Sequence, residues 1–452
     1  MKRLLLAFLL GGSAVQAQST YFQQTVNYTI QVKLDEANKL LRGYEQMEYI
    51  NRSPDTLRYI FMHLWPNAYK NDKTALNKQL VENGKLDFYL SDKRDRGFID
   101  SVSFTVNGKP VAMSEYNNQP DIAMITLSEP LLPGAKIDIA TPFRVVIPKV
   151  FSRLGFGKNN FQISQWYPKP AVYDRKGWHP MPYLDQGEFY SEYGSFDVSI
   201  TVPKNYVVAA TGNVTEEREK QFWLQRVASS DTQKARLTRQ YFDTLSEIST
   251  ETKTLRFKEN NIHDFAWFAS KKYMVDTATA ILANGRKVAC YSYYLPRNYF
   301  LYVGSARYTA RTIEYLSNKV GEYPYQHASV VDGTLLAGGG MEYPTITVIG
   351  SVSSADMLKT VILHEVGHNW FYGILGSNER MHPWMDEGMN SYYEHLLDEA
   401  IPVKEKNESA STGNTIESDK GVLNLSSKKL EKLSYLATAT VDLDQPCDAP
   451  SE

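Results

Sequence analysis

The stretch His364-Glu365-Val366-Gly367-His368, followed by a carboxylate in Trp384-Met385-Asp386-Glu387-Gly388, is the most informative part of the sequence. Residues four apart on a helix project from the same face, so His364 and His368 can reach one metal ion. Glu365 lies between them and can reach a water molecule at that ion. The spacing therefore predicts a metal site on a helix.

The flanking residues support this helix. Ser354 is suited to cap its start, Asp356 follows in the first turn, and apolar residues lead to the histidines. After the aromatic run 370–372 we expect the helix to stop at Gly373. A second helix, from Asp386 to Leu397, is expected to carry Glu387 against the first.

Two histidines and one glutamate leave one coordination position open, as in catalytic rather than structural zinc sites. We therefore predict that His364, His368 and Glu387 bind one Zn²⁺ ion, although cobalt and manganese accept the same donors. The alternative, a hydrogen-bonded histidine pair on a half-buried helix, gives Glu387 no role. Glu394 lies two helical turns after Glu387, and is expected to hydrogen-bond a ligand imidazole or else to face solvent.

This donor set predicts hydrolysis. Zinc lowers the pKa of bound water to about 7 and polarises a carbonyl group. Glu365 is the expected general base that takes a proton from the attacking water. Cleavage of an amide bond is the natural reaction for these groups.

A second motif lies upstream, in Ala337-Gly338-Gly339-Gly340-Met341-Glu342-Tyr343-Pro344. Together with the residues 369–386 between His368 and Glu387, it resembles the aminopeptidase N family of gluzincin metallopeptidases, in which a G-x-M-E-N motif precedes H-E-x-x-H. The chain has Tyr343 where the family usually has Asn.

The resemblance implies specific roles for this motif. Gly339 and Gly340 would let the substrate backbone lie against the chain, and Glu342 would bind the free amino group of the first substrate residue. A buried carboxylate facing an ammonium favours substrates with a free N-terminus over mid-chain peptides. Without the resemblance, the run is a glycine-rich turn and an edge strand with an incidental acid.

Two further family features match less well. Gln165 sits where the family's N-terminal domain sends a glutamine towards the active site, so it is expected to touch the substrate amine or to be purely structural. The family also uses a downstream tyrosine to stabilise the oxyanion. Tyr392 and Tyr393 are too close to Glu387, and Tyr435 has no matching motif. We expect the chain to end before this tyrosine and before the family's C-terminal helical domain.

The expected architecture is multidomain. From about residue 21 to 268 the apolar residues alternate with period two, as in 196–202 and before the turn Asn107-Gly108, which predicts an antiparallel all-β domain. We place this saddle-like domain at 18–272. Near residue 275 the pattern is expected to change to helical, with apolar residues at helical spacing from Val303 to Leu316. The resemblance implies an α+β thermolysin-like catalytic domain over 273–452, incomplete at its C-terminal end.

Three other segments have weaker signals. Thr215 to Lys253 carries a charge run that predicts a solvated excursion of the β-domain, or else a partner-binding surface. The run from Val403 to Asp419 is expected to be an exposed loop. Cys290 is expected to be a buried small residue, although pairing with Cys447 in an oxidising compartment stays open.

Residues 1–17 have the pattern of a secretory signal peptide: basic Lys2-Arg3, an apolar stretch over 4–10, and a small-residue cleavage site at Val15-Gln16-Ala17. We expect a mature start at Gln18 and a periplasmic or extracellular location, with association at the outer surface left open. The alternative, a retained membrane anchor, is disfavoured because the apolar stretch is short. No other transmembrane candidate is seen.

Length and composition agree with a large enzyme. The chain has 452 residues, 42% hydrophobic and 22% charged, and its net charge of -2 gives no reason to propose nucleic acid as a partner. The expected function is an exported zinc-dependent aminopeptidase acting on peptides. The alternatives are a zinc endopeptidase or epoxide hydrolase of the same fold, or a binding module without activity.

Overall fold

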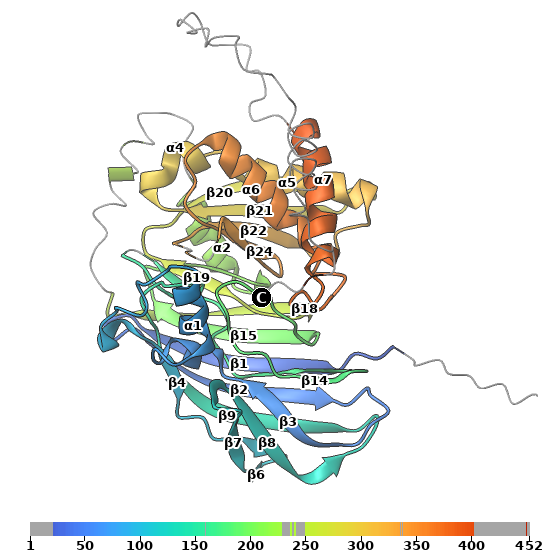
Figure 1. Ribbon diagram of the computed structural model, residues 1–452. Helices are drawn as coiled ribbons and strands as arrows, with labels where there is room; N and C mark the ends of the chain where they lie inside the picture. Colours follow the sequence, from blue (N-terminus) through green and yellow to red (C-terminus); the bar gives the residue numbers. More distant parts are fainter. Residues whose placement is uncertain are drawn as a thin grey trace, which may run out of the picture.

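The computed structural model describes residues 21–158, 160–227, 236, 239–240, 249–334, 336, 338–401 and 449. The predicted signal peptide, the predicted loop at 403–419, Tyr435 and Cys447 lie outside these residues. The protein is mostly β-structure, with several sheets and few helices (Figure 1).

The largest sheet has nine strands. Its order is β17 (Asn213–Val214), β18 (Thr252–Ile262), β15 (Gly194–Pro203), β1 (Thr25–Asp35), β2 (Leu40–Ile50), β9 (Lys136–Val146), β5 (Thr105–Val106) and β6 (Lys109–Pro110), with β4 (Phe98–Asp100) also paired to β9. The pairs are antiparallel except for β1 and β15, which are parallel. A wholly antiparallel domain was therefore the wrong expectation. The reason is that β15 joins β1 after a long crossover rather than through a tight hairpin.

Smaller sheets pack against this one. They are β12 (Lys169–Pro170), β3 (Leu57–His63), β8 (Gln119–Leu131) and β7 (Met113–Tyr116); β10 (Gly155–Phe156), β11 (Phe161–Ile163), β19 (Trp267–Ser270) and β16 (Val207–Ala210); and the pair β13 (Val172–Asp174) and β14 (Gly177–His179). This part also holds helix α1 (Ala75–Glu82) and the 3-10 turns η1 (Trp65–Tyr69) and η2 (Lys93–Asp95), so it is not purely β.

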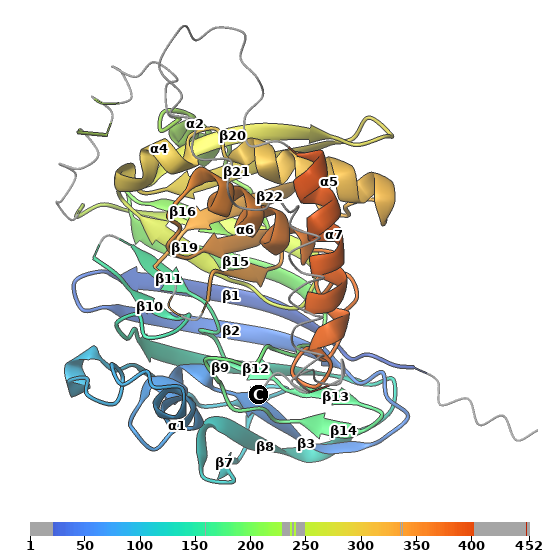
Figure 2. The ribbon, with the colours of Figure 1, turned by 45° about the horizontal axis from the view of Figure 1, so that its top comes forward.

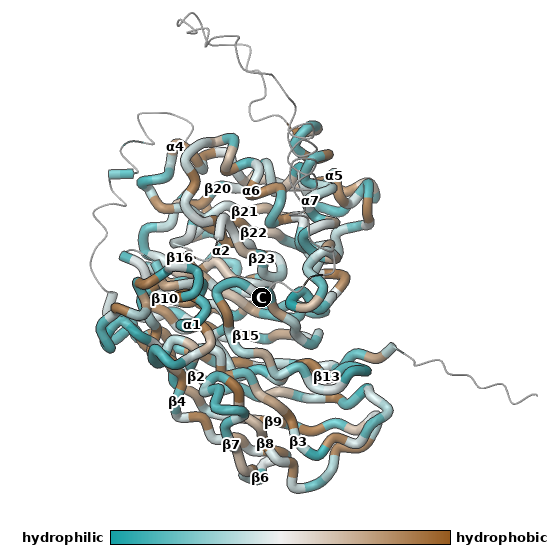
Figure 3. Tube along the Cα trace, in the orientation of Figure 1, coloured by the Kyte–Doolittle hydropathy of each residue, from teal (hydrophilic) through white to brown (hydrophobic). Residues whose placement is uncertain are grey.

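The alternation read from the sequence is present in these strands. In β15 the residues Phe196, Val198, Ile200 and Val202 are buried, and those between them are more exposed, apart from Pro203 at the strand end. Figure 3 shows short hydrophobic and hydrophilic stretches alternating along the strands. The hairpin between β5 and β6 turns at Asn107-Gly108, which both have positive φ, as a tight two-residue turn requires.

The remaining sheet has five strands in the order β20 (Met274–Ile281), β21 (Lys287–Tyr294), β22 (His327–Asp332), β24 (Ile346–Ile349) and β23 (Gly340–Tyr343). The other elements here are η3 (Pro296–Asn298), α4 (Tyr299–Tyr302), α5 (Ala306–Lys319), α6 (Ala355–Gly367), η4 (Pro383–Met385) and α7 (Glu387–Ala400). Helix α5 packs on β20 and β21, and α6 packs on β23 and β24 and between α5 and α7 (Figures 1 and 2). The helical spacing read after Val303 is confirmed by α5. The change to helix expected near residue 275 is wrong in its position, because the strands β20 and β21 come first.

The charge run after Thr215 is solvated in part, as Glu217 and Arg218 are exposed, and much of the predicted excursion lies outside the described residues. The run forms α2 (Glu217–Leu224), in which Glu219 departs from the expectation because it is buried and pairs with Lys253 at 2.7 Å. Trp223 of the same helix packs edge-on against Tyr291 and Tyr293 of β21. The helix therefore contacts the five-stranded sheet through Trp223, an aromatic residue that directly follows the charged residues in sequence.

The helix with the histidines ends earlier than expected, at Gly367 rather than Gly373. The next residues form turns, and Trp370, Phe371 and Tyr372 are all buried. The aromatic run is therefore part of the core although it lies outside the helix.

Other expectations concern the chain as a whole. Cys290 is buried with a free thiol, which confirms the prediction of a buried residue. Within the residues that the structure describes, no helix combines the length and apolar character needed to cross a membrane. The boundary predicted at 272/273 falls between β19 and β20, and it stays a prediction.

Candidate active site

Helix α6 presents two histidines because its opposite face is anchored. The Ser354 hydroxyl accepts a hydrogen bond from the Met357 N–H at 3.1 Å and so caps the helix, as the sequence predicts. Leu358, Ile362, Leu363 and Val366 are buried. This fixes the rotation of the helix and leaves His364 half-buried, while His368, in helical geometry at the C-cap, is buried beside it.

Glu387 is held in place by close packing of α7 on α6. A Cβ at Gly367 would lie 2.2 Å from Asn390 Oδ1, so only glycine permits this approach. The Asn390 side chain donates a hydrogen bond to the His364 carbonyl oxygen at 2.8 Å. As a result the first residue of α7, Glu387, lies over the two histidines.

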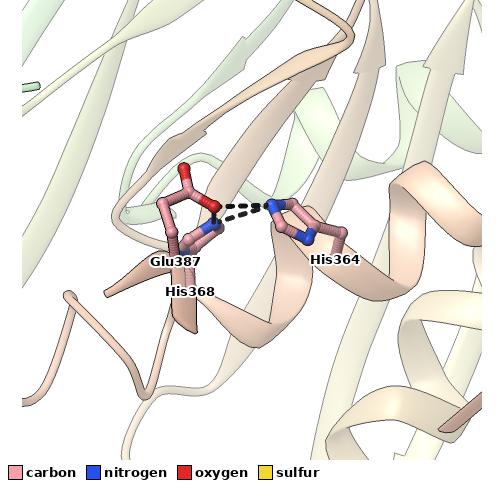
Figure 4. Close-up of side chains that lie close together, drawn as sticks. All are labelled: His364, His368 and Glu387. Carbon is pink, nitrogen blue, oxygen red and sulfur yellow. Dashed lines mark hydrogen bonds and ion pairs between the residues drawn. The ribbon is translucent and has the colours of Figure 1, made fainter. Parts of the chain in front are cut away.

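Three donor atoms converge on one point (Figure 4). The Nε2 atoms of His364 and His368 are 3.1 Å apart, and Glu387 Oε2 lies 3.2 Å and 3.7 Å from them. Ligand atoms about 2.0–2.1 Å from a tetrahedral zinc ion stand about 3.3 Å apart. The three predicted ligands therefore have the separations that a zinc ion requires.

Each imidazole is oriented by a second carboxylate. His364 Nδ1 is 2.7 Å from Glu394 Oε2, and His368 Nδ1 is 2.5 Å from Asp386 Oδ1. A carboxylate on Nδ1 fixes the tautomer that leaves Nε2 free to bind a metal. The contact predicted for Glu394 is thus present. Asp386 was missed, although it directly precedes Glu387 and this adjacency was the available signal.

The carboxylates control the charge of both rings. Burial lowers the pKa of His364, but hydrogen bonds to Glu387 and Glu394 outweigh it and raise the pKa to about 10. Burial likewise lowers the pKa of His368, and Asp386 and Glu342 outweigh it, so this pKa also rises. The site thus attracts positive charge, and a divalent cation can take the place of these protons.

Glu365 is buried next to this group, and its Oε2 atom has no hydrogen-bond partner. Burial raises its pKa to about 7, and the two neighbouring histidines oppose this rise. Glu365 lines a cavity of about 400 Å³ together with His364 and Glu387. An acid of this pKa in a cavity is suited to accept and return a proton near neutral pH.

The glycine-rich run forms the edge of this cavity. β23 is the last strand of its sheet, and Gly339 and Gly340 line the cavity. A Cβ at Gly340 would lie 2.2 Å from Glu365 Oε1, whereas a Cβ at Gly339 would meet nothing within 4 Å. Gly340 therefore leaves room for Glu365, a role that sequence reasoning did not foresee.

Glu342 lies on the same strand and also lines the cavity. It is only 7% exposed, and its Oε1 atom has no hydrogen-bond partner. Its carboxylate groups with those of Glu188 and Glu379, and Arg153 binds both oxygens of Glu188 at 3.1 Å and 3.2 Å. Sequence reasoning missed these three partners, because they come from irregular segments that carry no periodic pattern.

Gln165 contacts Tyr343 at the end of β23. It is buried with a φ of 47°, and its Oε1 accepts a hydrogen bond from the Tyr343 hydroxyl at 3.2 Å. It is not among the described residues that line the cavity. The substrate contact expected of Gln165 therefore stays a prediction, whereas its contact with Tyr343 is seen. Nor does any described tyrosine line the cavity.

Neither a protein-family model nor a curated protein sequence matches the chain. Its fold is similar to solved structures of M1 zinc metallopeptidases. An M1 zinc metallopeptidase from Deinococcus radiodurans matches with a TM-score of 0.53 and 17% identity, over 84% of this chain and 71% of that chain. A mutant from the same organism, bound to a Tyr-Ser-Ala substrate, matches with a TM-score of 0.54 and 16% identity over the same shares. A two-domain M1 mutant bound to L-arginine matches with a TM-score of 0.52 and 16% identity, again over 84% and 71%. The likeness shows a shared fold.

Proposed function

We propose that this protein is a zinc-dependent aminopeptidase that removes N-terminal residues from peptides. The observation that carries the proposal is the convergence of His364, His368 and Glu387 beside a buried Glu365, in a cavity edged by Glu342. The shared fold with zinc metallopeptidases, one of them bound to a tripeptide substrate, supports the same function.

His364, His368 and Glu387 would hold the zinc ion. Zinc, when bound, supplies a Lewis acid that makes a water molecule more acidic and polarises the scissile carbonyl group. Glu394 and Asp386 keep the two imidazoles in position and in the right tautomer throughout the reaction.

Glu365 performs the proton transfers. Its carboxylate accepts a proton from the attacking water and returns it to the leaving amine, which completes hydrolysis of the peptide bond. Because Gly340 has no side chain, the Glu365 carboxylate can lie directly against the edge strand. The substrate backbone would lie along the same strand.

Glu342 selects substrates with a free N-terminus. Its partnerless buried oxygen is expected to accept a hydrogen bond from the ammonium of the first substrate residue. A mid-chain peptide or a blocked terminus would leave this charge uncompensated, so exopeptidase action is favoured over internal cleavage.

The test compares the hydrolysis of two substrates by the zinc-loaded protein. One is a leucine amide with a free amino group, and the other is the same amide with its amino group acetylated. We expect kcat/KM for the free amine to exceed that for the acetylated substrate by at least about 100-fold, because the acetyl group removes the charge. Similar rates for both would point to an endopeptidase. No hydrolysis of either with zinc bound would point to a binding module or an epoxide hydrolase.

Export is part of the proposal, and it rests on residues 1–17. The mature protein should start at Gln18 and be found in the periplasm or outside the cell. N-terminal sequencing of the protein from fractionated cells checks this, and a chain that keeps Met1 in the cytoplasmic fraction would contradict it.

A further inference from the structure

A second cavity lies outside the active site and has no role in the proposed reaction. Its volume is about 660 Å³, and none of its described lining residues lines the cavity of the metal site. This volume is in the range of about 300–1,000 Å³ that is typical of small-molecule sites. Tyr193 and Asn261 come from the part with the large sheet, and Tyr325 and Leu375 come from the part with the five-stranded sheet. The fold therefore forms a second hollow of ligand size between these segments.

A β-bulge forms one wall of this cavity. Where β15 pairs with β18, Asn260 and Asn261 together stand opposite the single residue Ser195. Asn261 has a φ of 58°, in the left-handed region that asparagine adopts more readily than most residues. A bulge re-aims the side chains of its strand, and here both asparagines and the preceding Glu259 line the cavity. The bulge thus brings a carboxylate and two amides to one wall.

Three tyrosines also line the cavity. The Tyr193 hydroxyl donates a hydrogen bond to the Gly373 carbonyl oxygen at 2.6 Å, and the Tyr325 hydroxyl donates one to the Asn261 carbonyl oxygen at 2.9 Å. The third, Tyr21, is 82% exposed. Since Tyr193 and Tyr325 have no proton left to donate, they offer a ligand ring surface and oxygen lone pairs, both of which attract cations.

The charges at this cavity are negative. Its described lining contains Glu259 and Glu322 but no lysine, arginine or histidine. Glu322 pairs with Arg286 at 3.1 Å. Glu259 accepts hydrogen bonds from the Asn213 side chain and from the Asn260 N–H, each at 3.2 Å, and it forms no ion pair with a described residue. Burial raises the pKa of Glu259, which shows that its ionised form lacks a compensating positive charge.

We propose that this cavity binds an organic cation with a hydrocarbon stem, which pairs its charge with Glu259 and packs its stem against Ile374 and Leu375. These two side chains line the cavity and are 44% and 52% exposed, so a stem would cover apolar surface that faces solvent. A metal ion fits less well, because hard cations require several oxygen ligands and Glu259 is the only acid of the described lining without a basic partner. The inference does not depend on the proposed function.

The test compares butylguanidinium with butylurea, its neutral analogue of nearly the same shape. Binding is measured by calorimetry on the zinc-loaded wild type, on Glu259→Gln and on the control Glu82→Gln, whose side chain is 62% exposed on α1. We expect wild type and the control to bind butylguanidinium at least about 10-fold more tightly than butylurea, because only the cation pairs with a carboxylate. Glu259→Gln should remove this preference and leave the binding of butylurea unchanged.

A second variant locates the ligand without removing Glu259, and it also serves if Glu259→Gln fails to fold. Leu375→Lys places a positive charge in the cavity and should weaken butylguanidinium binding at least about 10-fold by repulsion. Its control is Leu224→Lys, at a position on α2 that is 62% exposed. If butylguanidinium binds equally to wild type and to both cavity variants, it is held elsewhere, for example by the acids of the active site, and the inference is overturned. A wild type without preference for the cation overturns it as well.

A free alkyl cation and the arginine side chain of a polypeptide share this chemistry. The blocked tripeptide acetyl-glycyl-arginyl-glycine amide separates the two sources, because the guanidinium is its only charge. If it binds within about 10-fold of butylguanidinium and Glu259→Gln weakens it equally, the cavity accepts basic side chains of polypeptides. Weaker binding of the tripeptide, with butylguanidinium still dependent on Glu259, assigns the cavity to free small cations.

Discussion

In the proposed site, some side chains hold the metal and another transfers a proton. Glu365 is the only one of them whose task requires both protonation states. Burial raises its pKa to about 7, and a divalent cation nearby lowers it again. The ionised form is the base, so activity should be present above this pKa and be lost as the pH falls through it.

We therefore expect the acid limb of kcat/KM against pH to have its midpoint at or below about pH 7. Glu365→Gln removes the titrating group, and should lower kcat at least about 100-fold while zinc content stays near one equivalent. The measurement is a pH profile with zinc analysis of both proteins. An acid limb well above pH 7, or a Glu365→Gln variant of normal activity, would rule out this base.

Asp386 should contribute to zinc affinity without touching the metal. Asp386→Asn keeps an oxygen for His368 Nδ1 but removes its charge, so we expect the zinc affinity to fall about 10-fold or more. Competition with a chelator measures this, with the exposed Asp72→Asn as the control. Equal affinities in all three proteins would mean that Asp386 only fills space.

Most of these residues could be predicted from the sequence because their spacing is local. His364, His368 and Glu365 follow from one helical turn, and Glu394 follows from two turns after Glu387. Asp386 was missed although it directly precedes Glu387, since linear order does not say that it reaches His368 Nδ1. Arg153, Glu188 and Glu379 come from segments without periodicity, and only the folded chain brings them together.

Among the elements, the contact of β23 with α6 sets the position of the base. Gly340→Ala would place a Cβ 2.2 Å from Glu365 Oε1, so the carboxylate must move. Because displacements of about 1 Å can cost about 100-fold in rate, we expect kcat/KM to fall at least about 10-fold while zinc still binds. The control is Gly321→Ala, where a Cβ meets nothing within 4 Å. Equal activity of the two variants would show that this packing does not matter.

The helices and strands were predicted correctly where the spacing of apolar residues is regular over a long stretch. β15 and α5 have clean alternation and clean helical spacing, and both are found. The end of α6 was missed because the residues after His368, which form turns, carry no glycine or proline before Gly373 to signal a stop. Similarly, the buried face of α2 was missed because the charges of this helix outnumber Trp223, which packs against β21.

Over the whole molecule, the site draws on parts of the chain that lie far apart in sequence. Arg153 and Glu188 belong to the first part, with its large sheet, and Glu342, Glu365 and Glu387 to the part built on the five-stranded sheet. Composition and periodicity indicate a β-rich chain followed by helices. They do not indicate the parallel pairing of β1 with β15, which depends on a connection of more than a hundred residues.

The most direct measurement is anomalous diffraction at the zinc edge from crystals of the metal-loaded protein. We expect a single peak about 2.0–2.2 Å from His364 Nε2, His368 Nε2 and a carboxylate oxygen of Glu387. A peak bound by other residues, or none at saturating zinc, would contradict the assignment of these three side chains as the metal ligands.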